Sequence, residues 1–195
     1  MARLSCLLLI LCGCPAPRPS CDRNRPSTVE LRDGSGALLI AAKPGERGSL
    51  DLCDAGLVRV GAVKQEPAAL TLQDRAGGTR LVLKKDGPDD GEALGADGQQ
   101  RLRVHRENGQ LFILDPIGIR LGMVAPSDGK TIFYDKQQTP AGSVEARGPD
   151  QAIRDPDGAT LFLVQPAASS QAAAVFTVAG LDHQEQMALY LLLLR

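Results

Sequence analysis

The stretch Asp182-His-Gln-Glu-Gln-Met-Ala-Leu-Tyr-Leu-Leu-Leu-Leu-Arg195 decides how the rest of this chain can fold. From Met187 to Leu194 the only polar side-chain group is the hydroxyl of Tyr190, and the Leu, Met and Gln residues favour a helix over residues 182–194. Asp182 followed three residues later by Glu is typical of the capping pair that begins a helix. A helix that is apolar on every side must be surrounded. Its length of roughly 20 Å is too short for a bilayer core of about 30 Å, so we expect protein to surround it.

The composition suits one β-rich domain with short additional segments. The chain has 195 residues, of which 43% are apolar and 23% are charged, and its net charge is −1. This balance gives no reason to expect nucleic acid as a partner. Aromatic residues make up only 3%, whereas there are 21 Gly and 13 Pro residues. Such a composition is typical of a structure with many turns rather than of a helical bundle.

The beginning of the chain is typical of an export signal. A positive charge and an apolar run precede Leu11-Cys-Gly-Cys14, which resembles the lipobox of bacterial lipoproteins, although small residues are more usual at the position of Cys12. On this resemblance residues 1–13 are removed, Cys14 carries lipid, and the Pro-rich residues 14–27 tether the domain to the inner or outer membrane of the cell envelope. The alternative is an ordinary secretory signal that is cut elsewhere. Either signal takes the protein out of the cytoplasm.

The five cysteines differ in their expected fates. Cys6 and Cys12 lie in the removed signal and Cys14 carries lipid, which leaves Cys21 and Cys53. In an oxidising envelope these two thiols are candidates for a disulfide between tether and domain, although the sequence alone does not prove the pairing. We expect no metal ion and no cofactor, because the sequence has no Cys-x-x-Cys and its two histidines have no suitably spaced partner.

An internal repeat of about 20 residues runs through the rest of the chain. Its signature is an apolar residue, any residue and then Asp, and the spacings between the Asp residues are 21, 20, 41, 20 and 20. Gly follows three residues after four of them, at the position where a tight turn needs a positive φ. The repeated segments are Leu31-Arg-Asp33, Leu52-Cys-Asp54, Leu72-Gln-Asp74, Ile113-Leu-Asp115, Phe133-Tyr-Asp135 and Ile153-Arg-Asp155.

Each repeat predicts a β-hairpin, because apolar residues alternate on both sides of the Asp/Gly turn. The spacing of 41 contains one altered repeat, in which we expect a solvated acidic loop at residues 86–98 and a further hairpin that turns at Glu107-Asn-Gly109. Residues 172–179 can supply one more strand before the final helix. Roughly a dozen antiparallel strands result.

These hairpins leave two long unpaired edges unless the sheet closes. A closed barrel of about twelve strands over residues 28–195 is too wide for its own side chains to fill, so we expect the helix at 182–194 to lie in its centre. One rival is another closed or sandwich-like β fold. Others are a repeat shell and a propeller, which give no reason for a single apolar C-terminal helix.

The pattern apolar-x-Asp-x-x-Gly-x-x-apolar, followed by a wholly apolar C-terminal helix, resembles the tubby C-terminal-like superfamily. That superfamily includes the plant LURP-one-related proteins and the phospholipid scramblases. The resemblance covers residues 28–195 and implies a twelve-stranded barrel around a central hydrophobic helix. This chain departs from it in its altered fourth repeat and its few aromatic residues. Tubby domains bind phosphoinositides, so the resemblance also implies a lipid or an anionic headgroup as ligand.

Basic residues alternate with apolar ones along one predicted strand and therefore share one face of it. With two nearby lysines, this candidate set for contacts to an anion or a lipid comprises Arg101, Arg103, His105, Lys84 and Lys85. A solvated outer face is the simpler interpretation of the same residues. The repeat Asp residues, in contrast, should shape turns rather than form a carboxylate array, because their period places them at separate turns.

No nucleophile motif accompanies any of these residues. The sequence therefore predicts a non-enzymatic envelope lipoprotein that binds a lipid, an anionic headgroup or a neighbouring protein. One alternative is a structural or assembly lipoprotein without a small ligand. A less favoured alternative is a cryptic hydrolase.

Overall fold

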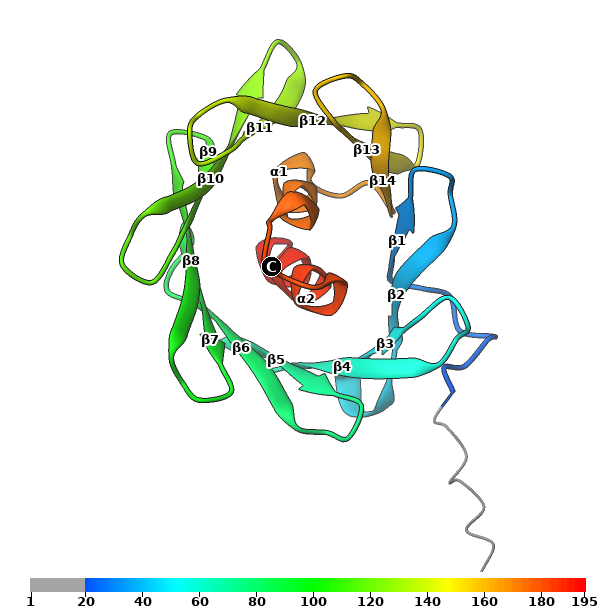
Figure 1. Ribbon diagram of the computed structural model, residues 1–195. Coiled ribbons are helices and arrows are strands. Elements are labelled where there is room, and N and C mark those ends of the chain that lie inside the picture. The colour runs from blue at the N-terminus through cyan, green and yellow to red at the C-terminus, as the bar shows by residue number, and fades with distance from the viewer. Residues whose placement is uncertain (1–19) are drawn as a thin grey trace, which may run out of the picture.

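The computed structural model describes residues 20–195 and shows a closed antiparallel β-barrel with helical segments inside it (Figure 1). Every strand pairs with its neighbours in sequence, and β1 closes the barrel by pairing with β14. The strands are β1 (Val29–Asp33), β2 (Leu38–Pro44), β3 (Leu50–Cys53), β4 (Arg59–Gln65), β5 (Ala69–Asp74), β6 (Thr79–Lys85), β7 (Asp90–Gly95), β8 (Gln100–Glu107), β9 (Gln110–Leu114), β10 (Arg120–Ser127), β11 (Lys130–Tyr134), β12 (Pro140–Arg147), β13 (Asp150–Arg154) and β14 (Thr160–Gln165). A short 3-10 turn, η1 (Glu46–Gly48), connects β2 to β3. The closed antiparallel barrel predicted from the repeat is confirmed.

The barrel has fourteen strands, and the expected number of about twelve was too low by one hairpin. The acidic stretch 86–98 is not a loop, because most of it forms β7 and the turn into β8. Gly95 takes the place that Asp holds in the other repeats. Its N–H donates to the carbonyl of Gln99 at 2.8 Å, and Gly98 follows three residues later with a φ of 76°. The β7–β8 turn therefore keeps the backbone conformation of the other repeats, although it lacks their Asp residue.

The repeat Asp residues shape the turns, as predicted. In the β9–β10 turn, one carboxylate oxygen of Asp115 accepts hydrogen bonds from the N–H groups of Ile117 at 3.0 Å and Ile119 at 2.8 Å. In each of the other Asp turns the carboxylate likewise accepts from the N–H four residues later, and those of Asp33 and Asp135 also accept from a second amide. The residue three positions after Asp has a positive φ even where it is not glycine, at Leu57 and Gln138. A carboxylate that satisfies two turn amides is committed to structure rather than to chemistry.

A one-residue bulge follows each of these seven turns. The extra residue interrupts the alternation of inward and outward side chains, as bulges do. The extra residues are Leu39, Val60, Arg80, Arg101, Leu121, Ala141 and Leu161. All seven lie at one end of the barrel, together with the turns β1–β2, β3–β4, β5–β6, β7–β8, β9–β10, β11–β12 and β13–β14. We call it the Asp-turn end, and we call the other the opposite end.

The C-terminal part passes through the barrel twice. After β14, α1 (Ser170–Ala173) and η2 (Ala174–Thr177) lead from the opposite end towards the Asp-turn end, and α2 (His183–Leu193) runs back to the opposite end. The expectation of a strand at residues 172–179 was wrong. This segment is buried among inward-facing side chains with no free sheet edge to join, and a helix satisfies its own backbone groups there.

The helix α2 confirms the sequence prediction. Asp182 is its N-cap, and its side chain and that of Glu185 form a reciprocal capping box. Its residues from Glu185 to Leu192 are all buried. Arg80 holds the N-terminal end through an ion pair with Asp182 at 2.6 Å, and Arg106 donates to the carbonyl of Leu193 at the other end at 3.2 Å. The core therefore consists of α2 and η2 surrounded by the inward residues of the strands.

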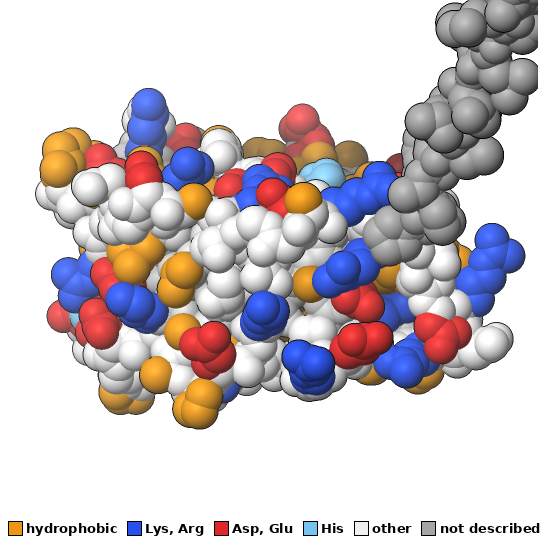
Figure 2. All heavy atoms as spheres, turned by 90° about the horizontal axis from the view of Figure 1, so that it is seen from below, with side chains coloured by type: hydrophobic (Ala, Val, Ile, Leu, Met, Phe, Trp, Pro, Cys, Tyr) orange, Lys and Arg blue, Asp and Glu red, His pale blue; other side chains and the backbone are white. Residues whose placement is uncertain are grey.

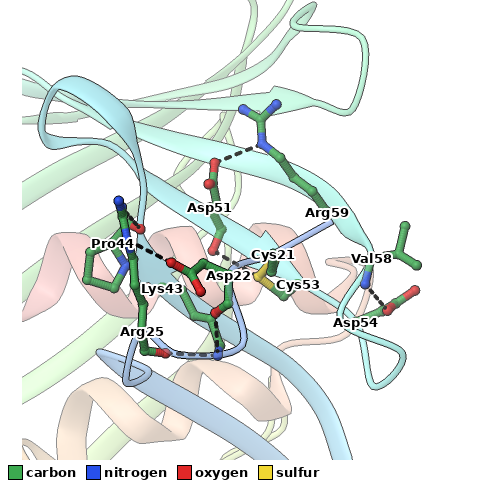
Figure 3. Close-up of a disulfide and its surroundings, with 10 residues drawn as sticks. All are labelled: Cys21, Asp22, Arg25, Lys43, Pro44, Asp51, Cys53, Asp54, Val58 and Arg59. Carbon is green, nitrogen blue, oxygen red and sulfur yellow. Dashed lines mark hydrogen bonds and ion pairs between the residues drawn. A yellow bond between two sulfur atoms is a disulfide. The ribbon is translucent and has the colours of Figure 1, made fainter. Parts of the chain in front are cut away.

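Residues 20–27, the described part of the predicted tether, lie against the outer face of β2 and β3. Cys21 and Cys53 form a disulfide, with their Cα atoms 6.2 Å apart (Figure 3). The ammonium group of Lys43 donates to the carbonyls of Asp22 and Arg25. The predicted signal peptide and Cys14 lie outside the described residues. No helix within residues 20–195 has the length and apolar character needed to cross a bilayer.

Candidate functional site

The predicted basic set does not form one free patch. Three of its residues, Lys84, Arg103 and His105, lie on the outer face of β6 and β8. The strand between them, β7, carries acidic residues on the same face. One oxygen of Asp90 is 2.9 Å from both Arg103 Nη2 and His105 Nδ1. Lys84 Nζ is 3.9 Å from a carboxylate oxygen of Glu92. These carboxylates neutralise much of the positive charge that alternation along β8 suggested.

The hydrogen bond from His105, followed by that from Arg103, lowers the pKa of Asp90. The carboxylate is thus ionised over the physiological range and stays paired. An incoming anion would have to replace it at both Arg103 and His105. Exposed pairs of this kind contribute little to stability, so their removal should leave the fold intact.

The remaining members of the set, Lys85 and Arg101, lie away from this cluster. Arg101 is the extra residue of the β7–β8 bulge at the Asp-turn end, so it does not continue the row of Arg103 and His105. Lys85 ends β6 at the opposite end. Neither makes an ion pair within residues 20–195. On the side formed by β4–β6, cationic and anionic side chains are likewise interspersed over the outer surface (Figure 2).

A hollow of about 480 Å³ lies beside the cluster, between Asp90, Arg103 and the β9–β10 turn. Both acidic and basic side chains line it. The part of the chain that the structure describes has no group of three His, Cys, Asp or Glu side chains arranged to hold a metal ion. The hollow therefore offers neither a uniform charge nor an enclosed apolar wall for a ligand.

An apolar chamber of about 400 Å³ lies between the barrel wall at β9–β12 and the helical segment. The wall contributes Ile113, Val124 and Phe133, and the helical segment contributes Ala174, Thr177 and Val178. Its size lies within the range of about 300–1,000 Å³ typical of small-molecule sites. Sequence reasoning missed this chamber.

Small residues on both sides leave the chamber open. Gly122 occupies an inward position on β10, and a Cβ built there would meet only the carbonyl oxygen of Tyr134, at 3.2 Å. Across the gap the chain presents the small residues Ala174 and Ala179, whereas α2 presents Leu, Met and Tyr to the other half of the wall. The Phe133 ring lies against Gly142 of β12, where a Cβ would clash with it. The barrel is therefore filled on the α2 side and left partly open on the α1–η2 side.

The chamber opens at the Asp-turn end. Its rim includes residues 135–137 of the β11–β12 turn, Leu121 and Ala179. One carboxylate oxygen of Asp135 accepts from the amides of its own turn, whereas the ammonium group of the neighbouring Lys136 is exposed and makes no ion pair within residues 20–195. The site thus combines an apolar interior with one available cation at its entrance.

No protein-family model matches the chain, and neither does any curated protein. Among solved structures, a protein of Arabidopsis thaliana aligns with a TM-score of 0.41 and 12% sequence identity, over 79% of this chain and 90% of that chain.

Proposed function

We propose that this protein is a non-enzymatic, lipid-anchored envelope protein whose barrel holds the hydrocarbon chain of an anionic lipid in the chamber. The observation that carries the proposal is the mainly apolar space between β9–β12 and η2, which opens at the Asp-turn end, with Lys136 at its rim. Each buried methylene contributes about 0.8 kcal/mol, so a chain with about ten of them inside gains roughly 8 kcal/mol before the costs of binding. The costs of association leave a dissociation constant weaker than the micromolar value to which a net gain of about 8 kcal/mol would correspond.

The membrane attachment is proposed at Cys14, by the resemblance of Leu11-Cys-Gly-Cys14 to a lipobox. A carboxylate and a phosphate headgroup share the chemistry that Lys136 would meet. The ligand is therefore either a free fatty acid or one chain of a phospholipid. Membership of the tubby C-terminal-like superfamily remains a proposal, supported by a barrel around a buried apolar helix. Fourteen strands and a second helical segment are departures from what that resemblance implies.

Lipid extraction and titration test the proposal. Full-length protein purified from membranes should release a lipid into organic solvent, and mass spectrometry distinguishes a fatty acid from a phospholipid. After delipidation the protein should bind a dansyl-labelled fatty acid. Gly122→Leu fills the chamber and should abolish this binding, whereas Ser143→Leu adds a side chain of the same size on the outward face of β12 and should not.

A second variant tests the same proposal if Gly122→Leu folds poorly. Lys136→Glu changes an exposed residue and should weaken binding of the fatty acid while leaving an uncharged fatty alcohol unaffected. The double variant Arg101→Ala with Arg103→Ala should behave as the unmodified protein. Loss of binding in that variant would instead place the ligand on the outer face. A protein that carries no lipid and binds no probe would favour a purely structural lipoprotein.

A further inference from the structure

The two ends of the barrel differ in polarity. Residues 20–195 expose five large apolar side chains, and four of them lie at the Asp-turn end: Ile117 is 81% exposed, Ile119 58%, Leu121 42% and Leu161 39%. At the opposite end, the connections between strands contain no Val, Ile, Leu, Met or Phe. These connections are residues 45–49, 66–68, 86–89, 108–109, 128–129 and 148–149. Exposed apolar side chains gathered at one end of a molecule mark a surface that contacts a membrane or a protein.

The chain enters the described structure at this same end. Ser20 forms a β-bridge with Val58, directly after the β3–β4 turn, and the N–H of Cys21 donates to the carbonyl of Leu57 at 2.8 Å. The disulfide to Cys53 fixes this position beside the turn, close to Val58 (Figure 3). The entry point therefore cannot move along the barrel wall while the disulfide is intact.

The short distance to the proposed lipid selects a membrane as the partner. Cys14 precedes Ser20 by six residues, which span at most about 20 Å even when fully extended. A strand of about seven residues places the opposite end roughly 20 Å farther from the bilayer. Only a fully extended tether would let the opposite end face the membrane. Any shorter span between Cys14 and Ser20 holds the Asp-turn end towards the membrane, and this is the end that carries both the apolar turns and the chamber entrance.

We propose that the Asp-turn end docks on the bilayer, with Ile117 and Ile119 of the β9–β10 turn and Leu161 of β14 inserted among the lipids. The chamber entrance then faces the membrane, and a hydrocarbon chain passes between bilayer and chamber without crossing water. Lys136, between the two apolar sites along the rim, meets anionic headgroups. This inference rests on the lipid anchor and the chamber of the proposed function.

Depth measurement tests the docking geometry directly. The lipidated full chain is reconstituted in vesicles of phosphatidylcholine and phosphatidylglycerol, with a single NBD label at Ile117→Cys or, as the control at the opposite end, at Glu66→Cys. The label at position 117 should shift its emission to shorter wavelength and be quenched by doxyl-labelled lipids, and the label at position 66 should do neither. Equal exposure of both labels to water, or quenching only at position 66, would overturn the inference.

Kinetics separate this inference from the proposed function. The double variant Ile117→Ser with Ile119→Ser should take up labelled lipid from vesicles at least about tenfold more slowly and should bind the monomeric fatty-acid probe unchanged. Unchanged uptake would refute docking while leaving the chamber in place. Probe binding retained in Gly122→Leu would refute the chamber, and the NBD labels would still decide the docking geometry.

Discussion

Removal of one buried hydroxyl should stabilise the protein. Tyr190 lies on α2, is fully buried and packs on Phe176 with the ring centroids 5.3 Å apart. Its hydroxyl has no hydrogen-bond partner within residues 20–195. Burial of a polar group without a partner costs about 1–3 kcal/mol, and Tyr190→Phe removes that group while keeping the ring contact. We expect the free energy of unfolding to rise by about 1–3 kcal/mol and Tm by roughly 2–4 °C for each kcal/mol.

Urea unfolding followed by far-UV circular dichroism measures this change, because the protein has no Trp for fluorescence. The midpoint should rise while the slope m stays constant, which means that stability and not compactness has changed. A Tyr190→Phe variant less stable than the unmodified protein by about 1 kcal/mol would show that the hydroxyl has a partner in solution and that this account of the core is wrong.

The same burial makes the stability depend on pH. Burial raises the pKa of Tyr190 to about 12, whereas a tyrosine in the unfolded chain ionises near 10. The folded state therefore favours the neutral phenol, so stability should fall as pH rises from about 10 through about 12. Tyr190→Phe should lose this fall. Spectrophotometric titration in a Tyr134→Phe background, which leaves Tyr190 as the single tyrosine, should show an unchanged phenol absorbance at pH 11.

Three further changes test the rest of the architecture. Arg80→Ala leaves the 9% exposed Glu185 without its cation and should cost about 1–3 kcal/mol in urea unfolding. Although burial opposes the effect, the hydrogen bond from Arg80 lowers the pKa of Asp182, so the difference should shrink as pH falls below about 4, and a constant difference would contradict the pairing. Gln138→Gly, at a φ of 63°, should raise stability by about 0.5–1 kcal/mol, and a lower Tm would mean that the turn conformation differs. Deletion of residues 182–195 removes the centre of the core and should prevent cooperative thermal unfolding, so a truncated protein with an unchanged Tm would show that the barrel does not need this helix.

The features that the sequence predicted correctly are those with local causes. An Asp and a positive-φ residue three positions later specify a turn through hydrogen bonds within five residues. The Asp repeat therefore predicted most of the hairpins. The helix α2 was equally clear, because its capping pair and its uniform apolarity are contiguous in the chain. Closure of the barrel followed from these two facts, since an entirely apolar helix needs a complete surround.

Features that depend on the backbone rather than on side-chain identity were missed. The β7–β8 hairpin has lost its Asp, and Gly95 makes the same turn without the signature residue. The helical segment at 172–179 contains Val and Phe, which favour a strand locally, yet the interior of a closed barrel has no edge for a strand to join. In both places tertiary context outweighed local preference.

The features of the candidate site likewise divide into those that the sequence predicted and those that it did not. Alternation along β8 placed Arg103 and His105 correctly on one face, because strand geometry has a fixed period of two. It could not reveal that Asp90 on the adjacent strand would pair with both, nor that a bulge would take Arg101 out of the row.

By itself, then, the sequence determined the hairpins, the central helix and the need for a closed barrel, because each arises from residues that are neighbours along the chain. Only the tertiary structure decided where the barrel is hollow. Gly122 and Ala174 are small residues about fifty positions apart, and the space between them exists only because the closed wall holds them opposite one another. The orientation of that space towards Ile117 and the disulfide-bound N-terminal segment is a property of the assembled barrel, since it depends on which turns share an end.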